Sequence, residues 1–315
     1  MNDDLHHAVG VCTFRRPALA ETLATLEAQR APDGGLTILV ADNDDAPSAR
    51  GLVEDFARTS RHEVVYLHAP ARNISVARNA ILAAARAGGT RFLAFIDDDE
   101  CAPRGWYLEL HAGLTRARAD AAVGPVRAIY PEDAPPWLAR ARTHDTEPEL
   151  DAQGRPVAGH SCNVLIDLGA PAFAGLEFSL ERGQTGGEDT AFFHAARRRG
   201  AVLCLAADAV VTEAVTPDRA GMRWLLQRRY RMGQTHGSLL AAEGGGRAGR
   251  AALAGAKLLW CGGAALLSLA DAERRNGALI RGALHAGVLA EAAGLRRVRP
   301  YVAPPRETDD GRQAS

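Results

Sequence analysis

Acidic side chains stand together at one point in this sequence, where they could bind a metal ion. Residues 97–100 read Asp-Asp-Asp-Glu and directly follow an apolar run at residues 92–96. Neighbouring carboxylates repel one another unless a cation is present. Mg²⁺ and Mn²⁺ prefer oxygen ligands and bridge carboxylates to substrate phosphates. The run therefore predicts that Asp97 and Asp99 hold a metal ion and a ribose hydroxyl, although an acidic solvated loop would look the same.

A second carboxylate pair could supply a general base. Glu188 and Asp189 follow two glycines and open a helical pattern whose apolar face includes Phe192 and Phe193. The positive end of a helix dipole favours the ionised form of a carboxylate in the first turn. An ionised carboxylate near an open approach can remove a proton from a hydroxyl. The alternative is that both residues only stabilise the helix start.

Other charged residues fit a nucleotide ligand. Arg228 and Arg231 are three residues apart on an expected helix, so both could reach a diphosphate. Asp42 follows an apolar run and could accept an N–H group of a nucleobase, with Arg78 near the base or the phosphates. A solvated basic face and an ordinary turn residue are the competing interpretations.

The elements that must position these residues alternate between strands and helices. Residues 8–14, 36–41, 63–67 and 91–96 are apolar runs of strand length. Helical patterns lie between them, one carrying Leu19, Leu23 and Leu26, another capped by Ser75. This order is typical of an α/β fold with a parallel sheet covered by helices.

Polar side chains follow each of these strands. In a parallel sheet such positions share one edge, which is where doubly wound folds bind ligands. We therefore expect one site at that edge. Its members follow the four strands in turn: Thr13, Phe14 and Arg15; Asp42 and Asn43; Arg72, Asn73 and Arg78; and Asp97, Asp98 and Asp99.

The second half of the chain gives a mixed pattern. We expect a strand at residues 121–130, a long loop at 131–159 and a strand at 161–166. A helix should follow at 188–199, closed by Gly200, and then a strand or strand pair at 201–211. Residues 221–295 look helical apart from a glycine-rich break at 244–249.

These patterns suggest a division of the chain. Residues 1–218 would form the main domain, with a nucleotide-binding half at 1–100 and an acceptor half at 101–218. Residues 219–300 would form a basic helical extension, and residues 301–315 a disordered tail. The net charge is -1, but the extension alone holds fourteen Lys and Arg against four Asp and Glu. Such asymmetry predicts an anionic surface partner at that end.

The extension contains an apolar stretch at residues 251–270, nearly long enough to span a bilayer. Lys257, several glycines and many alanines weaken that interpretation. Packing on the domain, a homodimer contact and a position in the interface of an anionic membrane remain open. Residues 1–7 are polar and unlike a signal peptide, so we expect a cytoplasmic protein, peripheral at the inner face of the membrane. We expect no nucleic-acid partner.

Six short segments resemble the family 2 glycosyltransferases, which have a GT-A fold. The branch that includes bacterial succinoglycan-type exopolysaccharide glucosyltransferases is the most similar. The resemblance covers most of the chain and depends on the order and spacing of the segments together. They read VCTFRRP from Val11, VADND from Val40, NISVARN from Asn73, FIDDDE from Phe95, NVLI from Asn163 and GEDT from Gly187.

The resemblance implies a Rossmann-like mixed sheet flanked by helices, with a C-terminal helical extension. It implies inverting, metal-dependent transfer of a hexose from a nucleotide diphosphate sugar, with UDP-glucose favoured. The acceptor would be a hydroxyl of a saccharide or a lipid-linked molecule in surface polysaccharide biosynthesis. The site residues it implies are Asp189 as base beside Glu188, a Mn²⁺ or Mg²⁺ ion on Asp97 and Asp99 with Asp98 between them, and Asp42 at the nucleobase with Arg78 close by. With the strand-end, helix and motif positions given above, the full set of expected nucleotide-sugar contacts is Thr13, Phe14, Arg15, Asp42, Arg78, Asp97, Asp98, Asn163, Arg228 and Arg231.

Two departures from the family pattern are visible. Many relatives carry a metal-binding histidine after the last strand, and Glu213 stands at the matching position here. Relatives that polymerise long chains carry Gln-x-x-Arg-Trp, which residues 227–231 (QRRYR) match only in part. The chain is therefore not expected to be a processive synthase.

Three other functions can be weighed against this one. A sugar nucleotidyltransferase needs a glycine-rich, lysine-bearing loop after the first strand, and CTFRRP is not such a loop. A dinucleotide oxidoreductase needs a G-x-G-x-x-G motif there, which is missing. A non-catalytic nucleotide-sugar or polysaccharide-binding protein would not need Asp189 and the acidic run together.

Overall fold

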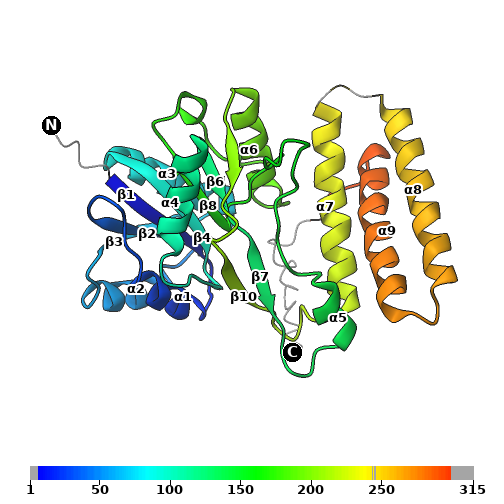
Figure 1. The fold of residues 1–315 in the computed structure, drawn as a ribbon, viewed down its shortest axis with the longest axis horizontal. Coiled ribbons are helices and arrows are strands. Elements are labelled where there is room, and N and C mark those ends of the chain that lie inside the picture. Colours follow the sequence, from blue (N-terminus) through cyan, green and yellow to red (C-terminus); the bar gives the residue numbers. More distant parts are fainter. Residues whose placement is uncertain (1–5, 243, 245, 299–315) are drawn as a thin grey trace, which may run out of the picture.

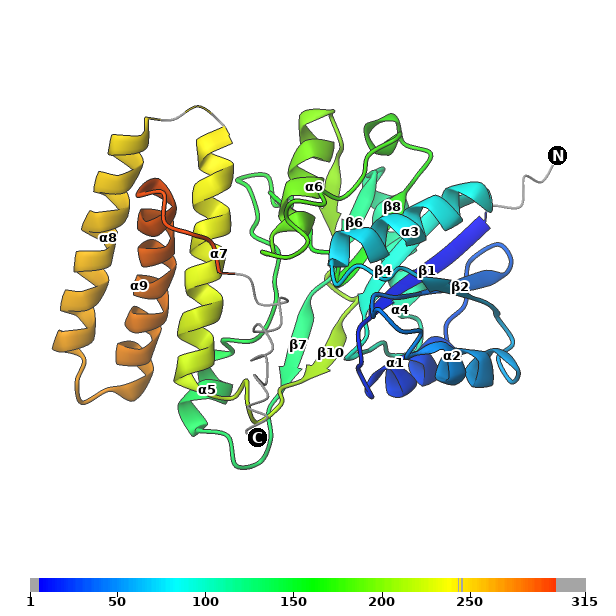
Figure 2. The ribbon, with the colours of Figure 1, turned by 180° about the vertical axis from the view of Figure 1, so that it is seen from behind.

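The computed structural model describes residues 6–242, 244 and 246–298. A mixed sheet with helices on both faces occupies one end of the molecule, and a layer of three long helices occupies the other (Figures 1 and 2). Two strands of a smaller sheet, β7 and β10, run between these two parts. The fold class expected from the sequence, α/β with a C-terminal helical extension, is confirmed.

The main sheet has seven strands in the order β3-β2-β1-β4-β8-β6-β9. The first four are parallel, β8 is antiparallel to both β4 and β6, and β9 is parallel to β6. Their bounds are β1 (His6–Thr13), β2 (Leu36–Asp42), β3 (Glu63–His68), β4 (Thr90–Asp97), β6 (Ala121–Val123), β8 (Asn163–Asp167) and β9 (Leu203–Leu205).

Two apolar clusters hold the layers together. Side chains alternate between the faces of a strand, so Phe92 and Ile96 of β4 pack into one cluster and Leu93 and Phe95 into the other. The first cluster joins the sheet to α1 (Leu19–Leu26), α2 (Arg50–Ala57) and α4 (Trp106–Ala117). The second joins it to α3 (Ile74–Ala87), α6 (Glu188–Arg198) and the short 3-10 helix η1 (Pro171–Phe173).

The smaller sheet corrects the expected strand at residues 121–130. That segment forms two strands in different sheets, β6 and β7 (Val126–Ile129), separated at Gly124 and Pro125. Proline has no N–H for a sheet ladder, and a Cβ at Gly124 would lie 2.4 Å from the carbonyl oxygen of Ala209. Residues 201–211 likewise serve two sheets, through β9 and β10 (Val211–Ala214). The third strand of the small sheet is β5 (Glu100–Cys101).

The expected loop at 131–159 contains a short helix, α5 (Pro136–Ala141). Leu138 from this helix packs against Leu225 and Ile280 of the helical layer. That contact orders a segment whose own sequence has little periodicity, so the interpretation as an uninterrupted loop was wrong.

The helical layer consists of α7 (Met222–Ala242), α8 (Arg247–Leu267) and α9 (Ala272–Ala292), with α9 between the other two (Figures 1 and 2). Glycine lets α7 and α9 approach closely, because a Cβ at Gly287 would lie 2.0 Å from the carbonyl oxygen of Tyr230. The expected break at 244–249 is shorter than predicted, since α8 already begins at Arg247. A second break, ahead of the N-cap Asp271, was not foreseen.

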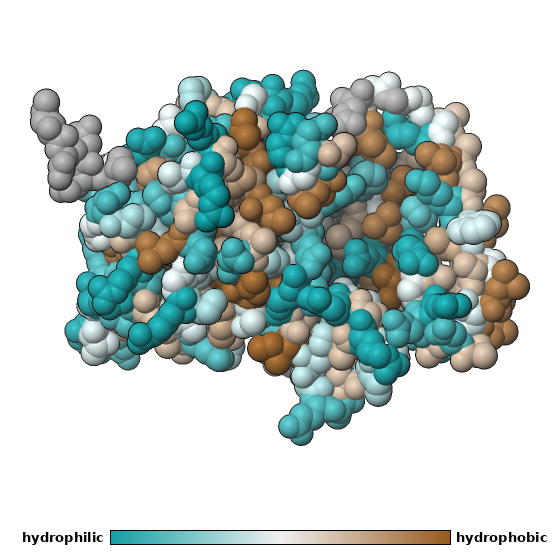
Figure 3. Space-filling view, viewed as in Figure 1, coloured by the Kyte–Doolittle hydropathy of each residue, from teal (hydrophilic) through white to brown (hydrophobic). Residues whose placement is uncertain are grey.

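The outer side of α8 is apolar and exposed. Leu259 is 78% exposed, Trp260 80% and Leu267 92%. Hydrophobic atoms accordingly appear along the outer edge of the molecule beside α8 (Figure 3). Within the described residues, α8 alone is long and apolar enough to cross a membrane by length and composition.

Candidate active site

The carboxyl ends of β1, β2 and β4 meet at one edge of the main sheet. Thr13 is in register with Asp42, and Cys12 with Asp97. This arrangement confirms that the residues after these strands share an edge, as the alternation of strands and helices predicted.

The loop after β1 sends two successive arginines to different carboxylates. Arg15 has a φ of 51°, in the left-handed region that side chains other than glycine seldom adopt. Its guanidinium bonds to Asp44 at 2.7 Å, away from the acidic run. Arg16 instead lies 3.3 Å from Asp98 and 2.6 Å from Asp99. Arg16 was not singled out from the sequence, although it lies in the first motif segment.

Asp98 is fixed between β1 and this arginine. The hydroxyl of Thr13 donates to Asp98 at 2.7 Å, and the side chain of Asp98 is buried. Phe14, the remaining candidate from this loop, is 42% exposed and lies under the guanidinium of Arg15 at 5.4 Å.

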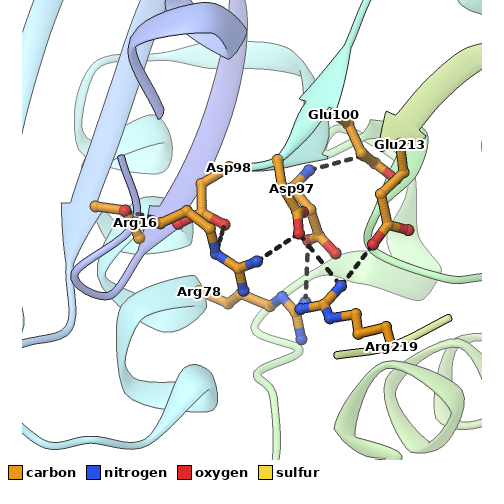
Figure 4. Close-up of polar contacts among 9 residues, drawn as sticks. Arg16, Arg78, Asp97, Asp98, Glu100, Glu213 and Arg219 are labelled. Carbon is orange, nitrogen blue, oxygen red and sulfur yellow. Dashed lines mark hydrogen bonds and ion pairs between the residues drawn. The ribbon is translucent and has the colours of Figure 1, made fainter. Parts of the chain in front are cut away.

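A further arginine comes from the segment ahead of the helical layer. Arg219 lies 3.4 Å from Asp99 and 2.7 Å from Glu213 on β10 (Figure 4). Glu213 is brought close because it pairs with Glu100 of β5, directly after the acidic run. The structure therefore places Glu213 beside the acidic run, where its match to the family histidine predicts it. Arg219 carried no motif signal and was missed.

Burial and mutual repulsion raise the pKa values of several carboxyl groups in this cluster. Desolvation raises the pKa of Asp97 to about 6, with Asp99 and Glu213 adding to the shift and Arg78 opposing it. Desolvation also raises the pKa of Asp98 to about 7, against the effect of Arg16. The pKa values of Glu100 and Glu213 are raised for the same leading reason. Such a site favours the entry of positive charge.

The arginines occupy the spaces between these carboxylates (Figure 4). Throughout the described part of the chain, no three His, Cys, Asp or Glu side chains converge in an arrangement that could hold a metal ion. The side chain of Asp97 remains 44% exposed and so offers its oxygens to a ligand.

Arg78 links the acidic run to the second carboxylate pair. Its helix, α3, is capped by Asn73 and not by the predicted Ser75, because the Asn73 side chain accepts from the Ser75 N–H. The buried Arg78 guanidinium bonds to Glu188 and lies 3.7 Å from Asp97. Burial alone would lower the pKa of Arg78, but Glu188 and Asp97 raise it overall. Glu188 is thus a buried partner of a fixed cation.

Asp189 has a different environment from Glu188. It is half-buried in the first turn of α6 and accepts from the Thr190 N–H at 2.6 Å. The helix begins after Gly187, which has a φ of 81° and no room for a Cβ because Thr235 of α7 lies 2.1 Å away. Of the two carboxylates, Asp189 is the one that a substrate can approach.

His160 is an additional group near Asp189. Burial lowers its pKa while the charge of Asp189 raises it. Its buried Nε2 atom has no hydrogen-bond partner among the described residues. His160 was not predicted from the sequence, since it lies between the loop expected at 131–159 and the strand expected at 161–166 and has no motif around it.

Two predicted ligand contacts need correction. Asn163 is fully buried, accepts from Trp106 at 2.9 Å, and donates to the carbonyl groups of Pro125 and Ala209. These bonds use the side chain to join β8 to the segments ahead of β7 and β10, so it does not face the nucleotide-sugar site.

Asp42 is likewise fully buried. It accepts from the N–H groups of Asp44 and Ala49 and from the hydroxyl of Tyr66 at 2.9 Å. Desolvation and this bond raise the pKa of Tyr66 to about 12. In this conformation Asp42 organises the loop after β2 and presents no surface to a nucleobase.

The two predicted diphosphate ligands on α7 differ in position. Arg228 stacks over the ring of Trp224 at 5.1 Å, and the same ring lies 5.8 Å from the guanidinium of Arg219. Arg228 is therefore next to the carboxylate cluster. Arg231 lies farther along the helix and lines a cavity between the helices.

The comparisons with known proteins agree with this geometry. Residues 8–177 match the family model described as Glycosyl transferase family 2. The chain belongs to that family. It is 42% identical over 303 residues to the succinoglycan biosynthesis protein ExoM of Rhizobium meliloti (strain 1021), covering 95% of this chain and 97% of ExoM. It is therefore a glycosyltransferase of the succinoglycan type.

Solved glycosyltransferases share the fold at low sequence identity. The mannosyltransferase PcManGT from Pyrobaculum calidifontis, solved with GDP-Man and Mn²⁺, has a TM-score of 0.60 and 18% identity, with 92% of this chain and 88% of that one covered. S. aureus TarS has a TM-score of 0.51 and 15% identity over 90% of this chain. The chain spans only about half of TarS, at 52% of its length. The GT-A fold expected from the resemblance is confirmed.

Proposed function

We propose that this glycosyltransferase moves a hexose, with inversion, from a nucleotide diphosphate sugar to a hydroxyl of a saccharide or lipid-linked acceptor in surface polysaccharide biosynthesis. The observation that carries the proposal is the meeting, at one sheet edge, of the cluster around Asp97 and Asp99 with Asp189. Similarity to ExoM supports the polysaccharide assignment. UDP-glucose is the favoured donor because the sequence resembles the succinoglycan-type glucosyltransferases.

The carboxylates fit a divalent cation, Mn²⁺ or Mg²⁺. Asp97 and Asp99 supply hard oxygen ligands, and the side chain of Asp97 is 44% exposed and so open to an ion. Glu213 lies on the other side of Arg219 from Asp99, so Arg219 would have to move before Glu213 could join Asp97 and Asp99 at the ion. When bound, the ion neutralises charge on the departing nucleotide diphosphate. The Mn²⁺ bound by PcManGT supports this part of the proposal.

The roles of the protein groups follow from their environments. Asp189, half-buried and not ion-paired to Arg78, removes the proton from the acceptor hydroxyl as the oxygen attacks the anomeric carbon. Glu188 holds Arg78 in place, and the guanidinium of Arg78 lies 3.7 Å from Asp97. Arg16 and Arg219 supply fixed positive charge beside Asp99, where the diphosphate is stabilised as it leaves.

Peripheral contact with an anionic membrane belongs to the same proposal. The outer side of α8 is apolar and exposed, and α8 carries Arg247, Arg250 and Lys257 without any Asp or Glu. Helices of this composition lie in the interface of anionic bilayers. Contact through α8 would place the enzyme beside a lipid-linked acceptor.

The proposal predicts metal-dependent turnover of a nucleotide sugar. UDP-glucose, other UDP-hexoses and GDP-mannose are incubated with the protein and Mn²⁺, and release of UDP or GDP is measured. We expect release from UDP-glucose, abolished by EDTA and restored by excess Mn²⁺.

A matched pair of variants tests the ligand assignment. Asp99→Ala should behave like permanent chelation, whereas Asp55→Ala, at an exposed ion pair on α2, should keep full activity. Undiminished turnover in excess chelator would contradict the metal assignment. Absence of release from every donor would contradict the proposed reaction.

A further inference from the structure

A trough of about 830 Å³ lies within the helical layer, separate from the carboxylate cluster. Its floor is formed by α9, mainly by small residues, and its two walls come from α7 and α8. Pockets of this volume are typical of small-molecule sites. The floor residues are Ala278, Leu279, Gly282, Ala283 and Ala286, and all but Leu279 are small.

The lining suits an uncharged, elongated group. Leu226 and Tyr230 stand on the α7 wall, and Leu258 and Cys261 on the α8 wall. No Asp or Glu belongs to the lining among the described residues. The lone charged side chain there is Arg231, on the α7 wall. The trough is thus mostly apolar, with Gln227 and Arg231 as polar side chains on the α7 wall.

One end of the trough reaches the active site. Trp224 lines the trough and its ring lies 5.8 Å from the guanidinium of Arg219, which in turn lies 3.4 Å from Asp99. Arg228 stacks on the same ring at 5.1 Å. A molecule in the trough would therefore have one end beside two arginines and the carboxylate cluster.

The α8 wall of the trough borders the exposed apolar surface of the molecule. Leu258 and Cys261 of α8 face the trough, while Leu259 and Trp260 of the same helix are 78% and 80% exposed. A single helix thus separates the trough from the surface proposed to contact a membrane. That continuity indicates what kind of molecule reaches the trough.

We infer that the trough binds the hydrocarbon chain of an amphiphilic acceptor, whose phosphate-bearing head lies at the Trp224 end between Arg219 and Arg228. The inference rests on the proposed function, because it identifies the acceptor as a molecule with a long apolar chain. The small residues of α9 leave the space that the chain fills, and the arginines meet the charge of the head.

Binding of a chain can be measured without any transfer. Full-length protein is titrated with cis-parinaric acid, whose fluorescence rises in apolar sites, and the probe is displaced with dodecyl phosphate or with inorganic phosphate. We expect displacement by dodecyl phosphate alone. Ala283→Trp, which fills the trough, should weaken probe binding by about tenfold or more. Ala272→Trp, at the exposed start of α9, should not change it.

Folding of the variants is checked by thermal unfolding, and Gly282→Ala serves as a second, milder variant. A Cβ at Gly282 would meet Cys261 at 3.4 Å, an ordinary contact, so this change keeps the fold while narrowing the trough. We expect it to weaken probe binding less than Ala283→Trp. Equal probe binding by wild type and both trough variants would overturn the inference.

Further outcomes separate the trough from the proposed reaction. Transfer to soluble saccharides without any chain binding would support the proposed reaction and overturn the inference about the trough. Chain binding without turnover of any donor would support the inference about the trough and overturn the proposed reaction. Binding that appears only after removal of residues 299–315, or only as the protein dissociates from a dimer, would mean that the chain itself or a second copy fills the trough, and would also overturn the inference.

Discussion

The sheet edge and the helical layer differ in the kind of surface they offer: the first is charged and the second is apolar. At the sheet edge, Asp97, Asp98 and Asp99 are crowded together, and arginines from three separate segments balance their charge. In the helical layer, the trough lining and the outer side of α8 offer apolar surface that the described residues leave largely uncovered. A charged, pre-organised site suits a nucleotide diphosphate and an open apolar one suits a lipid. The contrast fits the proposed pairing of a nucleotide diphosphate donor with an acceptor that carries an apolar chain.

Replacement of the proposed base should give the largest effect and should be confined to the sheet edge. Asp189→Asn keeps the shape of the side chain but removes its basicity, so turnover should fall by roughly two to four orders of magnitude. Donor binding, measured by calorimetry, should persist. Glu181→Gln, an exposed change in the loop ahead of α6, is the control. A variant that loses nucleotide affinity but keeps turnover would reverse the assignment.

Charge introduced on α8 should remove membrane contact and leave the sheet edge unaffected. Intact protein should float with vesicles containing anionic lipid at low salt and detach at high salt, as screening weakens the attraction. Trp260→Glu with Leu267→Glu should abolish flotation while release of UDP in solution continues. Leu150→Glu, at another exposed leucine, is the matched control. If intact protein stays in solution with every vesicle, α8 has a structural role only.

The pH dependence of stability should be a smaller effect that belongs to the sheet edge. The pKa of Asp98 is about 7 in the folded protein against an ordinary value of 3.8. Between these values the folded state holds more protons than the unfolded state, so the free energy of unfolding falls as pH rises. Asp98→Asn cannot ionise and should remove a slope of at most about 1.4 kcal/mol per pH unit.

The measurement is urea unfolding at several pH values between 4 and 8 in the presence of chelator. The difference between variant and wild type is needed, because other groups titrate with the opposite sign. Burial lowers the pKa of His7 to about 4, so its contribution to stability is lost as pH falls from about 6.5 towards 4. Asp55→Asn should follow the wild-type curve; an equal change in slope there would show that Asp98 is not its source.

The sheet edge was largely predictable from the sequence because its residues are tied to strand ends. Because β4 ends at Asp97, this residue lies at the carboxyl edge of the parallel sheet. The partners that satisfy these carboxylates were not predictable. Arg219 lies 120 positions from Asp99 and reaches it only through the placement of β10, which pairs with β5 and β7. Asn163 was wrongly predicted to contact the ligand, because residue type alone does not show whether an amide side chain is exposed to a ligand or bonded within the core.

The helices of the helical layer were predictable from the sequence, but their packing order was not. Apolar periodicity indicated helices through residues 221–295, yet it could not show that α9 lies between α7 and α8. That order depends on close approach at glycines such as Gly287, whose role becomes visible only when Tyr230 is found beside it. The trough follows from the same order, since small residues of α9 face it by geometry that the sequence alone does not give.

Arg219 belongs to both regions, and this has a thermodynamic consequence. It pairs with Asp99 and Glu213 while its guanidinium lies over the ring of Trp224 at the end of the trough. A ligand that takes Asp99 away from Arg219 alters the energy of that stacking, and a ligand on Trp224 alters the pairing. Any coupling free energy between the two ligands is the same in both directions. Donor and acceptor affinities measured together would therefore give one number for the linkage that this side chain provides.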